Sequence, residues 1–193
     1  MRLKDKVAIV VGAGQTAGET IGNGRATAIR FAQEGATVLV VDRNRESAEE
    51  TARMIAGDGG QASVLAADIT SETDCRGIAD TCLERYGRID ILHNNVGRSE
   101  GDRATTEMDA EVWDQLMAMN LKGMFLTVSS IASICARREP GQRSGITYKT
   151  SKGAVNTLTH HIALENAEYG IRCNAILPGL MDTPMAIERR ARE

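Results

Sequence analysis

The stretch that decides the fold reads VAIVVGAGQTAGETIGNGRATAIRFAQEG and covers residues 7–35. It begins with a run of β-branched and small aliphatic residues, Val7 to Val11, which is typical of a buried strand. A glycine-rich turn follows, and residues 24–34 then place apolar side chains at the spacing of a helix. Gly35 is a typical helix C-terminus. The stretch therefore predicts a strand, a glycine-rich turn and a helix, in that order.

The glycine-rich turn predicts a dinucleotide site. Glycine lets the backbone approach a pyrophosphate closely, and the helix that follows offers unpaired N–H groups and a partial positive charge. The candidate glycines are Gly12, Gly18, Gly22 and Gly24. Asp42 ends the next aliphatic run, where a carboxylate accepts hydrogen bonds from ribose hydroxyls and repels a 2′-phosphate. We therefore expect NAD rather than NADP as the cofactor. The alternative is a flexible turn, with Asp42 as a helix cap.

The rest of the chain continues the alternation. Further strands are predicted at residues 37–41, 62–66, 89–93 and 172–177, with helices at 46–56, 71–86 and from about 105–108 onward. This order predicts an α/β fold of Rossmann type, a doubly wound parallel sheet in three α/β/α layers. Ligands of such sheets bind at the carboxyl ends of the strands. The residues that follow these strand ends are Gly12, Asp42, Asp68 and Asn95. We expect residues 1–193 to form a single domain.

Composition excludes several classes of function. The chain has 193 residues and a formal net charge of −3, so it offers no basic field for nucleic acid or for an anionic membrane. No apolar run approaches the length of about 20 residues that a membrane span needs, and the charged N-terminus does not resemble a secretory signal. The four cysteines lack the close pairing of a zinc site, so we expect no metal, reduced thiols and a cytoplasmic location.

Further motifs follow the turn in a fixed order. They are Asp68-Ile69, Asn94-Asn95-Val96-Gly97, Asn120, Tyr148 with Lys152 in the pattern YxxxK, and Pro178-Gly179 followed by Thr183. The turn itself carries the spacing GxxxGxG at Gly18, Gly22 and Gly24, with extra residues inserted after Gly12. On these motifs the chain resembles the classical short-chain dehydrogenase/reductase family from Val7 to Met185.

The resemblance implies an oxidoreductase that transfers a hydride between a nicotinamide cofactor, NAD or NADP, and a secondary alcohol or ketone. The cofactor residues that it implies are Gly12, Gly18, Gly22, Gly24, Asp42, Asp68, Ile69, Asn95, Gly97, Tyr148, Lys152, Pro178, Gly179 and Thr183. Tyr148 would be the general acid/base, because the ammonium of Lys152 one helical turn away lowers the pKa of a tyrosine hydroxyl, ordinarily about 10. Asn120 would position a water molecule, and a serine would hold the substrate oxygen. A small-molecule alcohol or ketone and a homo-oligomer are the expected partners.

The chain departs from the family's pattern in two places. The segment for the end of the fourth helix and the fifth strand is short, so the run Met124–Val128 either completes a helix or forms a strand. The catalytic serine is therefore open, with Ser130 the better match and Ser133 the fallback. After Thr183 little of the family's closing segment remains. We expect a late strand to be missing or remodelled. The alternative functions are dinucleotide binding without turnover and an interaction domain without a ligand.

Overall fold

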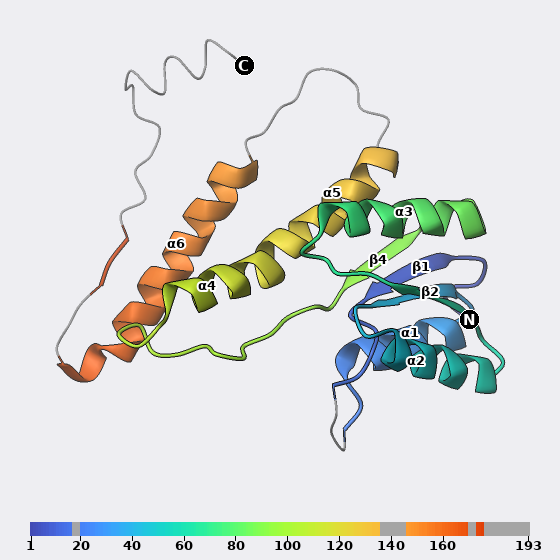
Figure 1. Ribbon diagram of the computed structural model, residues 1–193, viewed down its shortest axis with the longest axis horizontal. Coiled ribbons are helices and arrows are strands. Elements are labelled where there is room, and N and C mark those ends of the chain that lie inside the picture. Colours follow the sequence, from blue (N-terminus) through green and yellow to red (C-terminus); the bar gives the residue numbers. More distant parts are fainter. Residues whose placement is uncertain (17–19, 136–145, 170–172, 176–193) are drawn as a thin grey trace, which may run out of the picture. The chain divides into compact units, whose positions relative to one another are not determined.

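The computed structural model describes residues 1–16, 20–135, 146–169 and 173–175 (Figure 1). The chain divides into two compact units. The first comprises Met1–Asp102 and Met108–Arg137, and the second Arg103–Glu107 and Arg138–Glu193. The single domain expected for residues 1–193 stays a prediction.

The centre of the first unit is a parallel sheet. Its strands are β1 (Val7–Val11), β2 (Thr37–Asp42), β3 (Gln61–Ala66) and β4 (Ile91–Asn94). They lie in the order β3-β2-β1-β4, with Val11 in register with Val41 on one side and Asn94 on the other. The carboxyl ends of these strands therefore meet at one edge of the sheet, as the sequence predicts.

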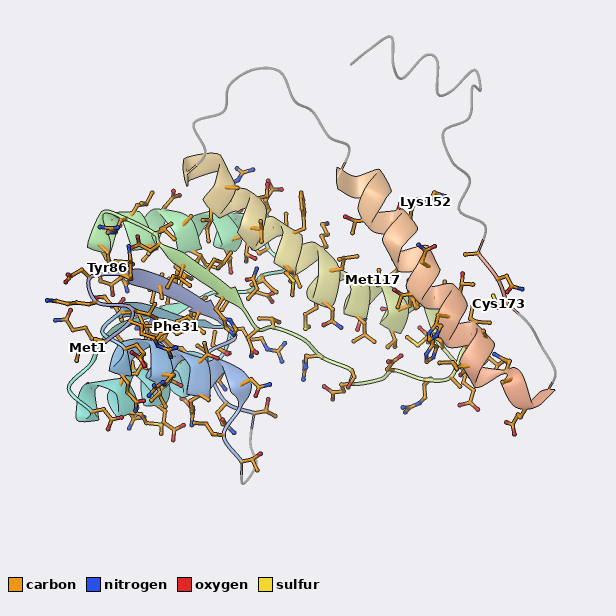
Figure 2. All side chains as sticks on the ribbon, turned by 180° about the vertical axis from the view of Figure 1, so that it is seen from behind. Met1, Phe31, Tyr86, Met117, Lys152 and Cys173 are labelled. Atoms are coloured by element: carbon orange, nitrogen blue, oxygen red, sulfur yellow. The ribbon has the colours of Figure 1, made fainter. Side chains whose placement is uncertain are left out.

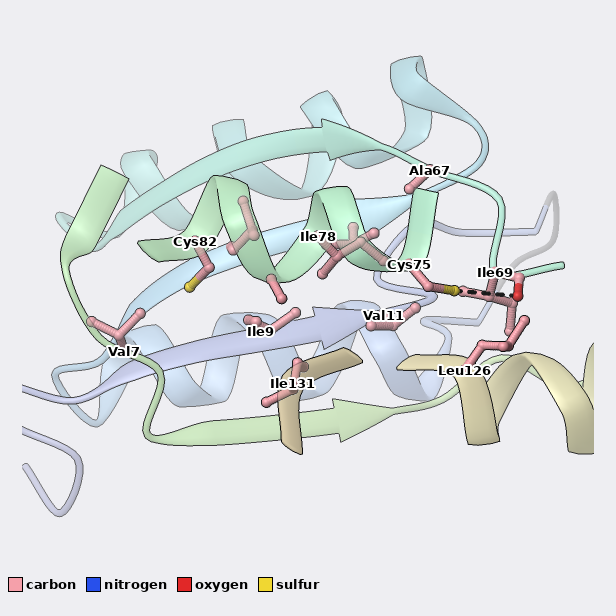
Figure 3. Packing of buried hydrophobic residues seen from close by; sticks show 13 residues of the cluster. Val7, Ile9, Val11, Ala67, Ile69, Cys75, Ile78, Cys82, Leu126 and Ile131 are labelled. Atoms are coloured by element: carbon pink, nitrogen blue, oxygen red, sulfur yellow. Dashed lines mark hydrogen bonds between the residues drawn. The ribbon is translucent and has the colours of Figure 1, made fainter. Parts of the chain in front are cut away.

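Helices cover both faces of the sheet. On one face lie α1 (Asn23–Gln33) and α2 (Arg45–Gly57), and on the other α3 (Glu72–Tyr86) and α5 (Met124–Cys135) (Figure 1). Alternate residues of β1 enter the two cores. Val10 lies on the side of α1 and α2, whereas Ile9 and Val11 lie on the side of α3 and α5, as Figure 3 shows. Because β1 is buried on both faces, all of its residues are aliphatic. The predicted doubly wound, three-layer Rossmann-type fold is confirmed.

The ends of these helices follow local signals in the sequence. Asn44 caps α2 by accepting a hydrogen bond from the N–H of Ser47, and Ser71 caps α3 in the same way with Asp74. Gly87 ends α3 in the left-handed conformation, at φ 73°. For this reason, the predicted bounds of α2 and α3 agree with the observed bounds to within a residue.

A long helix contains the run Met124–Val128, for which the sequence leaves helix and strand open. α4 (Ala110–Met117), the π-helical segment η1 (Ala118–Gly123) and α5 follow one another without a break (Figure 1). The run Met124–Val128 belongs to α5 and thus completes a helix. Within the described residues the sheet has four strands, so the expectation of a missing or remodelled late strand is met in that part of the chain.

The start of this helix corrects one prediction. The helix begins at Ala110 and not at residues 105–108. The reason is its cap, since the Asp109 carboxylate accepts hydrogen bonds from the N–H groups of Glu111 and Val112. An aspartate cap followed by a glutamate in the first turn suits the positive end of a helix.

The second unit contains α6 (Ile146–Glu165) and a short 3-10 helix, η2 (Ala167–Tyr169). Glu165 at the end of α6 accepts hydrogen bonds from the hydroxyl and, at 2.9 Å, the N–H of Thr105, and these bonds hold the pKa of its carboxyl below the ordinary value. Of the last predicted strand, residues 173–175 have no regular secondary structure and the others lie outside the described residues. None of the helices in the described ranges is long and apolar enough to cross a membrane.

Asp90 ties the start of β4 to the start of β1. Its carboxylate accepts hydrogen bonds from the N–H of Val7 at 2.9 Å and from the guanidinium of Arg88 at 2.8 Å and 2.6 Å. The Arg88 side chain, and after it the Val7 N–H, hold the pKa of the Asp90 carboxyl below its ordinary value. This carboxylate therefore stabilises the fold above its unfolded-state pKa of about 4, and the contribution is lost as the pH falls through the folded-state pKa.

We expect Arg88→Met to raise the pKa of Asp90 toward its ordinary value, because the substitution removes the largest cause of the shift. NMR titration of the Asp90 carboxyl carbon measures this directly. In urea unfolding, the loss of stability in the variant should be present at pH 7 and should shrink below about pH 4. The control is Arg76→Met, which breaks a surface ion pair with Glu72 on α3. An Asp90 pKa that Arg88→Met leaves unchanged would contradict the assignment.

Candidate functional site

A cavity opens at the carboxyl edge of the sheet in the first unit. Its volume is about 610 Å³, within the range of about 300–1,000 Å³ that is usual for small-molecule sites. The glycine-rich turn, the ends of β1 and β2, the segments after β3 and β4, and η1 all contribute to its wall. The predicted cofactor residues that line it are Gly12, Gly22, Gly24, Asp42, Asp68, Ile69, Asn95 and Gly97. The strand order thus brings together residues from four separate parts of the sequence.

The N-terminus of α1 faces this cavity. Gly22 is the N-cap, and Gly22, Asn23 and Gly24 line the cavity. The first N–H groups of a helix have no partner within the helix. Here the cap has no side chain to take them, and the first turn holds no acidic residue. This end of α1 therefore suits an anion, which would meet both the N–H groups and the positive end of the helix dipole.

Two glycines let segments approach more closely than a side chain permits. A β-carbon at position 24 would lie 1.9 Å from the carbonyl oxygen of Gly12, so only glycine lets α1 begin this close to the end of β1. A β-carbon at Gly14 would lie 2.7 Å from Oδ2 of Asp42. Motif spacing does not reveal Gly14 as a site residue, because its constraint comes from a carboxylate on the neighbouring strand.

Asp42 joins the turn to the segment that leads into α2. Its Oδ2 accepts a hydrogen bond from the N–H of Gly14 at 2.9 Å, and Oδ1 accepts one from the N–H of Asn44 at 2.9 Å. Each carboxylate oxygen keeps a further lone pair, so Asp42 can also accept hydrogen bonds from hydroxyls of a ligand in the cavity. Arg43 and Asn44 line the cavity too. Motif matching does not single them out, although their position directly after a strand end indicates that they belong to the site.

Asp68 and Ile69 follow β3. Asp68 Oδ1 accepts hydrogen bonds from the N–H of Thr70 at 2.8 Å and from its hydroxyl at 2.7 Å, and both hold the pKa of the Asp68 carboxyl below its ordinary value. Ile69 is buried, and its carbonyl accepts a hydrogen bond from the Cys75 thiol at 3.4 Å (Figure 3). Burial raises the pKa of Cys75 to about 11, so the thiol keeps its proton at neutral pH and remains a donor. The thiol thus helps to hold Ile69 at the cavity wall.

Asn95 and Asn120 position the segment that follows β4. Asn95 Nδ2 donates to the carbonyl of Gly12 at 3.4 Å. Asn120, in the π-helical η1, donates from Nδ2 to the carbonyl of Arg98 at 2.8 Å and accepts from the N–H of Arg98 at 2.9 Å. Arg98 and Met119 line the cavity, and motif matching did not single out either of them. The expected role of Asn120 in positioning a water molecule stays a prediction.

Ser130 has a different environment from the one that the motif implies. It lies inside α5, is buried, and donates a hydrogen bond to the carbonyl of Leu126 at 2.8 Å, one turn earlier. It is not among the residues that line the cavity. The physical reason is that the apolar run before Ser130 continues a helix, whereas the motif expects a serine at the end of a strand.

The remaining predicted residues lie in the second unit or outside the described residues. Tyr148 and Lys152 belong to α6, and Lys152 is exposed (Figure 2). The side chains of Tyr148 and Ser133 lie outside the described part of the chain. So do Gly18, Pro178, Gly179 and Thr183. In the described ranges, no group of three or more His, Cys, Asp or Glu side chains could hold a metal ion.

Comparison with known families gives this geometry a context. A family model described as short chain dehydrogenase matches residues 6–193. The chain belongs to the short-chain dehydrogenase/reductase family. Members of the short-chain dehydrogenase/reductase family similar to this chain include an uncharacterized oxidoreductase of Bacillus subtilis, YxbG, 34% identical over 95% of this chain and 70% of the relative. Another is the 2-(R)-hydroxypropyl-CoM dehydrogenase of Xanthobacter autotrophicus, 36% identical over 93% of this chain and 76% of the relative.

Solved structures of short-chain dehydrogenases/reductases agree with this membership. A short-chain dehydrogenase/reductase from Burkholderia xenovorans superimposes with a TM-score of 0.66 at 31% identity, covering 99% of this chain and 80% of that one. An NAD⁺-bound xylitol dehydrogenase gives 0.63 at 30% identity, covering 98% of this chain and 76% of that one. An actinorhodin polyketide ketoreductase with NADPH gives 0.62 at 31% identity, covering 97% and 75%. The family membership supports oxidoreduction of hydroxyl or keto groups with a nicotinamide cofactor in general, and leaves open which cofactor.

We expect Gly24→Ala to abolish measurable NADH binding and to destabilise the fold. The new β-carbon would lie 1.9 Å from the carbonyl oxygen of Gly12, so α1 has to move away from β1 and its N-terminus leaves the cavity. Calorimetric titration and urea unfolding measure the two effects. The matched control is Gly77→Ala in α3, where a β-carbon meets nothing within 4 Å and the helix gains about 1 kcal/mol. Equal behaviour of the two variants would contradict this account.

Proposed function

We propose that this chain binds NAD in the cavity of the first unit and transfers a hydride between it and a secondary alcohol or ketone. One observation carries the binding part of the proposal. The open N-terminus of α1 and the carboxylate of Asp42 line the same cavity, one suited to a pyrophosphate and the other to ribose hydroxyls. The close approach that Gly24 permits supports the fit, because a side chain there would collide with the carbonyl oxygen of Gly12 and move the start of α1 away from the cavity.

The residues of the first unit that would hold the cofactor line the cavity. We infer that the α1 N-terminus with Gly12, Gly22 and Gly24 holds the pyrophosphate, and that Asp42 accepts from the adenine ribose. The remaining contacts are carried over from the family resemblance: Asp68 and Ile69 at the adenine, Asn95, Gly97, Tyr148 and Lys152 toward the nicotinamide ribose and ring, Gly18 in the turn, and Pro178, Gly179 and Thr183 at the carboxamide.

The chain's own residues would manage the proton and the orientation of the substrate. When bound, NAD supplies the acceptor for the hydride that leaves the carbinol carbon. Tyr148 would take the hydroxyl proton as the C–O bond gains its double-bond character, and would return it in the reverse direction. Lys152 would favour the phenolate form of Tyr148 through its positive charge. A serine would hold the substrate oxygen, with Ser130 the better match by motif and Ser133 the fallback, and Asn120 would position a water molecule for proton relay.

A second candidate function is dinucleotide binding without turnover. The observation that favours it is the environment of Ser130, whose hydroxyl donates within α5 to the carbonyl of Leu126. A serine that orients a substrate has to present its hydroxyl to the reacting carbonyl, and this one is already engaged. A cytoplasmic location and a homo-oligomer stay predictions of the sequence.

We expect Tyr148→Phe to reduce kcat by about 10²–10⁴-fold, because the variant lacks the hydroxyl that transfers the proton. Steady-state assays with NAD and a panel of secondary alcohols measure this, and NADH titration checks that binding persists. The control is Tyr86→Phe, which removes a hydroxyl that donates to Ser63 on β3. If the wild type binds NADH without turning over any alcohol or ketone, the second candidate is correct. If Tyr148→Phe retains full turnover, the role of Tyr148 is wrong.

We expect Asp42→Asn to shift cofactor preference toward NADPH by about tenfold, because the negative charge that repels a 2′-phosphate is lost while an acceptor oxygen remains. Asp42→Ala should in addition weaken NADH binding, since the N–H of Gly14 loses its partner. Calorimetric dissociation constants for NADH and NADPH measure both effects. Asp58→Asn, at the exposed end of α2, is the control. An unchanged ratio of the two constants would show that Asp42 does not read the ribose.

A further inference from the structure

The glycine-rich turn contains residues that its spacing does not need. Without residues 16–21, Gln15 would be followed directly by Gly22, and the turn would read GAGQGNG from Gly12 to Gly24. That string has the compact spacing GxxxGxG. In the structure the two outer glycines of this string already meet, since a β-carbon at position 24 would lie 1.9 Å from the Gly12 oxygen. Six residues, 16–21, are therefore inserted into an otherwise compact turn between Gln15 and Gly22.

The side chain of Gln15 links the residue before this insertion to residues at its far end. Its Nε2 donates a hydrogen bond to the carbonyl of Thr20 at 2.6 Å, and its Oε1 accepts one from the N–H of Gly22 at 2.7 Å. The primary amide of glutamine can donate from its nitrogen and accept at its oxygen at the same time. Gly22 is the N-cap of α1, so the second bond acts on the end of the helix that faces the cavity.

The backbone of Gln15 is held in turn by α2. Its N–H donates to Ser47 Oγ at 2.6 Å, and the Ser47 hydroxyl donates back to its carbonyl at 3.2 Å. Arg25 of α1, whose side chain is 7% exposed, donates from Nη2 to Ser47 Oγ at 3.3 Å and to Glu50 at 2.7 Å. The Thr51 hydroxyl donates to the carbonyl of Ala13 at 2.8 Å. Gln15 is therefore a fixed point between α2 and the N-cap of α1.

We propose that Gln15 is a positioning residue for the dinucleotide site. In a compact turn, Gln15 would be bonded directly to the residue that begins α1. In this lengthened turn, the hydrogen bonds of its amide hold Gly22 in place instead. The inference rests on the proposed function, because the helix end that Gln15 holds is the expected pyrophosphate site. The amide holds the N-cap of α1 at the wall of the cavity that Asp42 also lines. Gln15 does not contact the reacting atoms.

The first experiment compares Gln15→Met with the wild type. Methionine keeps the length and volume of the side chain but provides neither hydrogen bond. We expect NADH to bind about tenfold more weakly by calorimetric titration, which corresponds to the loss of one or two partly exposed hydrogen bonds. The matched control is Gln33→Met on α1, whose amide donates to Asp58 and accepts from Arg30 on the surface. This variant should leave the affinity unchanged.

A second readout separates positioning from general damage to the fold. ADP carries the pyrophosphate that the α1 N-terminus would bind, and adenosine does not. We expect Gln15→Met to weaken ADP by the same factor as NADH and to leave adenosine unchanged, with both ligands followed by NMR titration. A variant in which residues 16–21 are deleted gives a further test. In that shortened turn Gln15 is bonded directly to Gly22, so the hydrogen bonds of its amide are not needed to hold the N-cap. Adding Gln15→Met should then change NADH affinity less than twofold.

Each outcome decides the matter. Selective loss of NADH and ADP binding in Gln15→Met, absent from Gln33→Met and cancelled by the deletion, supports the proposal. Unchanged NADH affinity in Gln15→Met overturns it while the proposed function stands. Equal loss of adenosine and ADP, or the same loss in the shortened turn, also overturns it, since the effect would then be general. A wild type that binds no NADH refutes the proposed function and with it the role of Gln15.

Discussion

The first unit depends on one close contact, between the start of α1 and the end of β1. Position 24 has no room for a side chain, because a β-carbon would lie 1.9 Å from the carbonyl oxygen of Gly12. This contact brings the positive end of the helix to the edge where the parallel strands end. The cavity, Asp42 and the segment after β4 are all arranged around that point. A larger residue at position 24 would separate the helix end from the strand ends.

The walls of the cavity are held by the protein itself. Asp42 and Ser47 accept hydrogen bonds from successive N–H groups of the glycine-rich turn. Asn120 accepts a hydrogen bond from the N–H of Arg98 and donates one to its carbonyl. A site whose backbone is already ordered loses less conformational entropy when a ligand binds. The same bonds determine which N–H groups are left for a ligand, and in the turn these are concentrated at the start of α1.

The absence of a fifth strand from the described residues changes the chemistry that the chain presents. The run Met124–Val128 follows directly on η1, and extending an existing helix is easier than starting a strand that needs a crossover to reach its neighbour. Ser130 consequently lies inside a helix with its hydroxyl bonded to Leu126. Many of the residues predicted for the cofactor line one cavity of the first unit, whereas the serine that the motif implies has a helical environment.

The sequence by itself determined the order of strands and helices through α3, the three-layer fold, and the set of glycine, aspartate and asparagine residues that meet at one edge. Aliphatic runs, caps such as Asn44 and Ser71, and Gly87 are local signals that act within a few residues. Only the tertiary structure decided whether Met124–Val128 would be helix or strand, and which groups Gln15, Asp42 and Asn120 would bind. The physical reason is that these partners are brought together by packing, so their distances depend on how whole elements lie against one another and not on neighbouring residues in the chain.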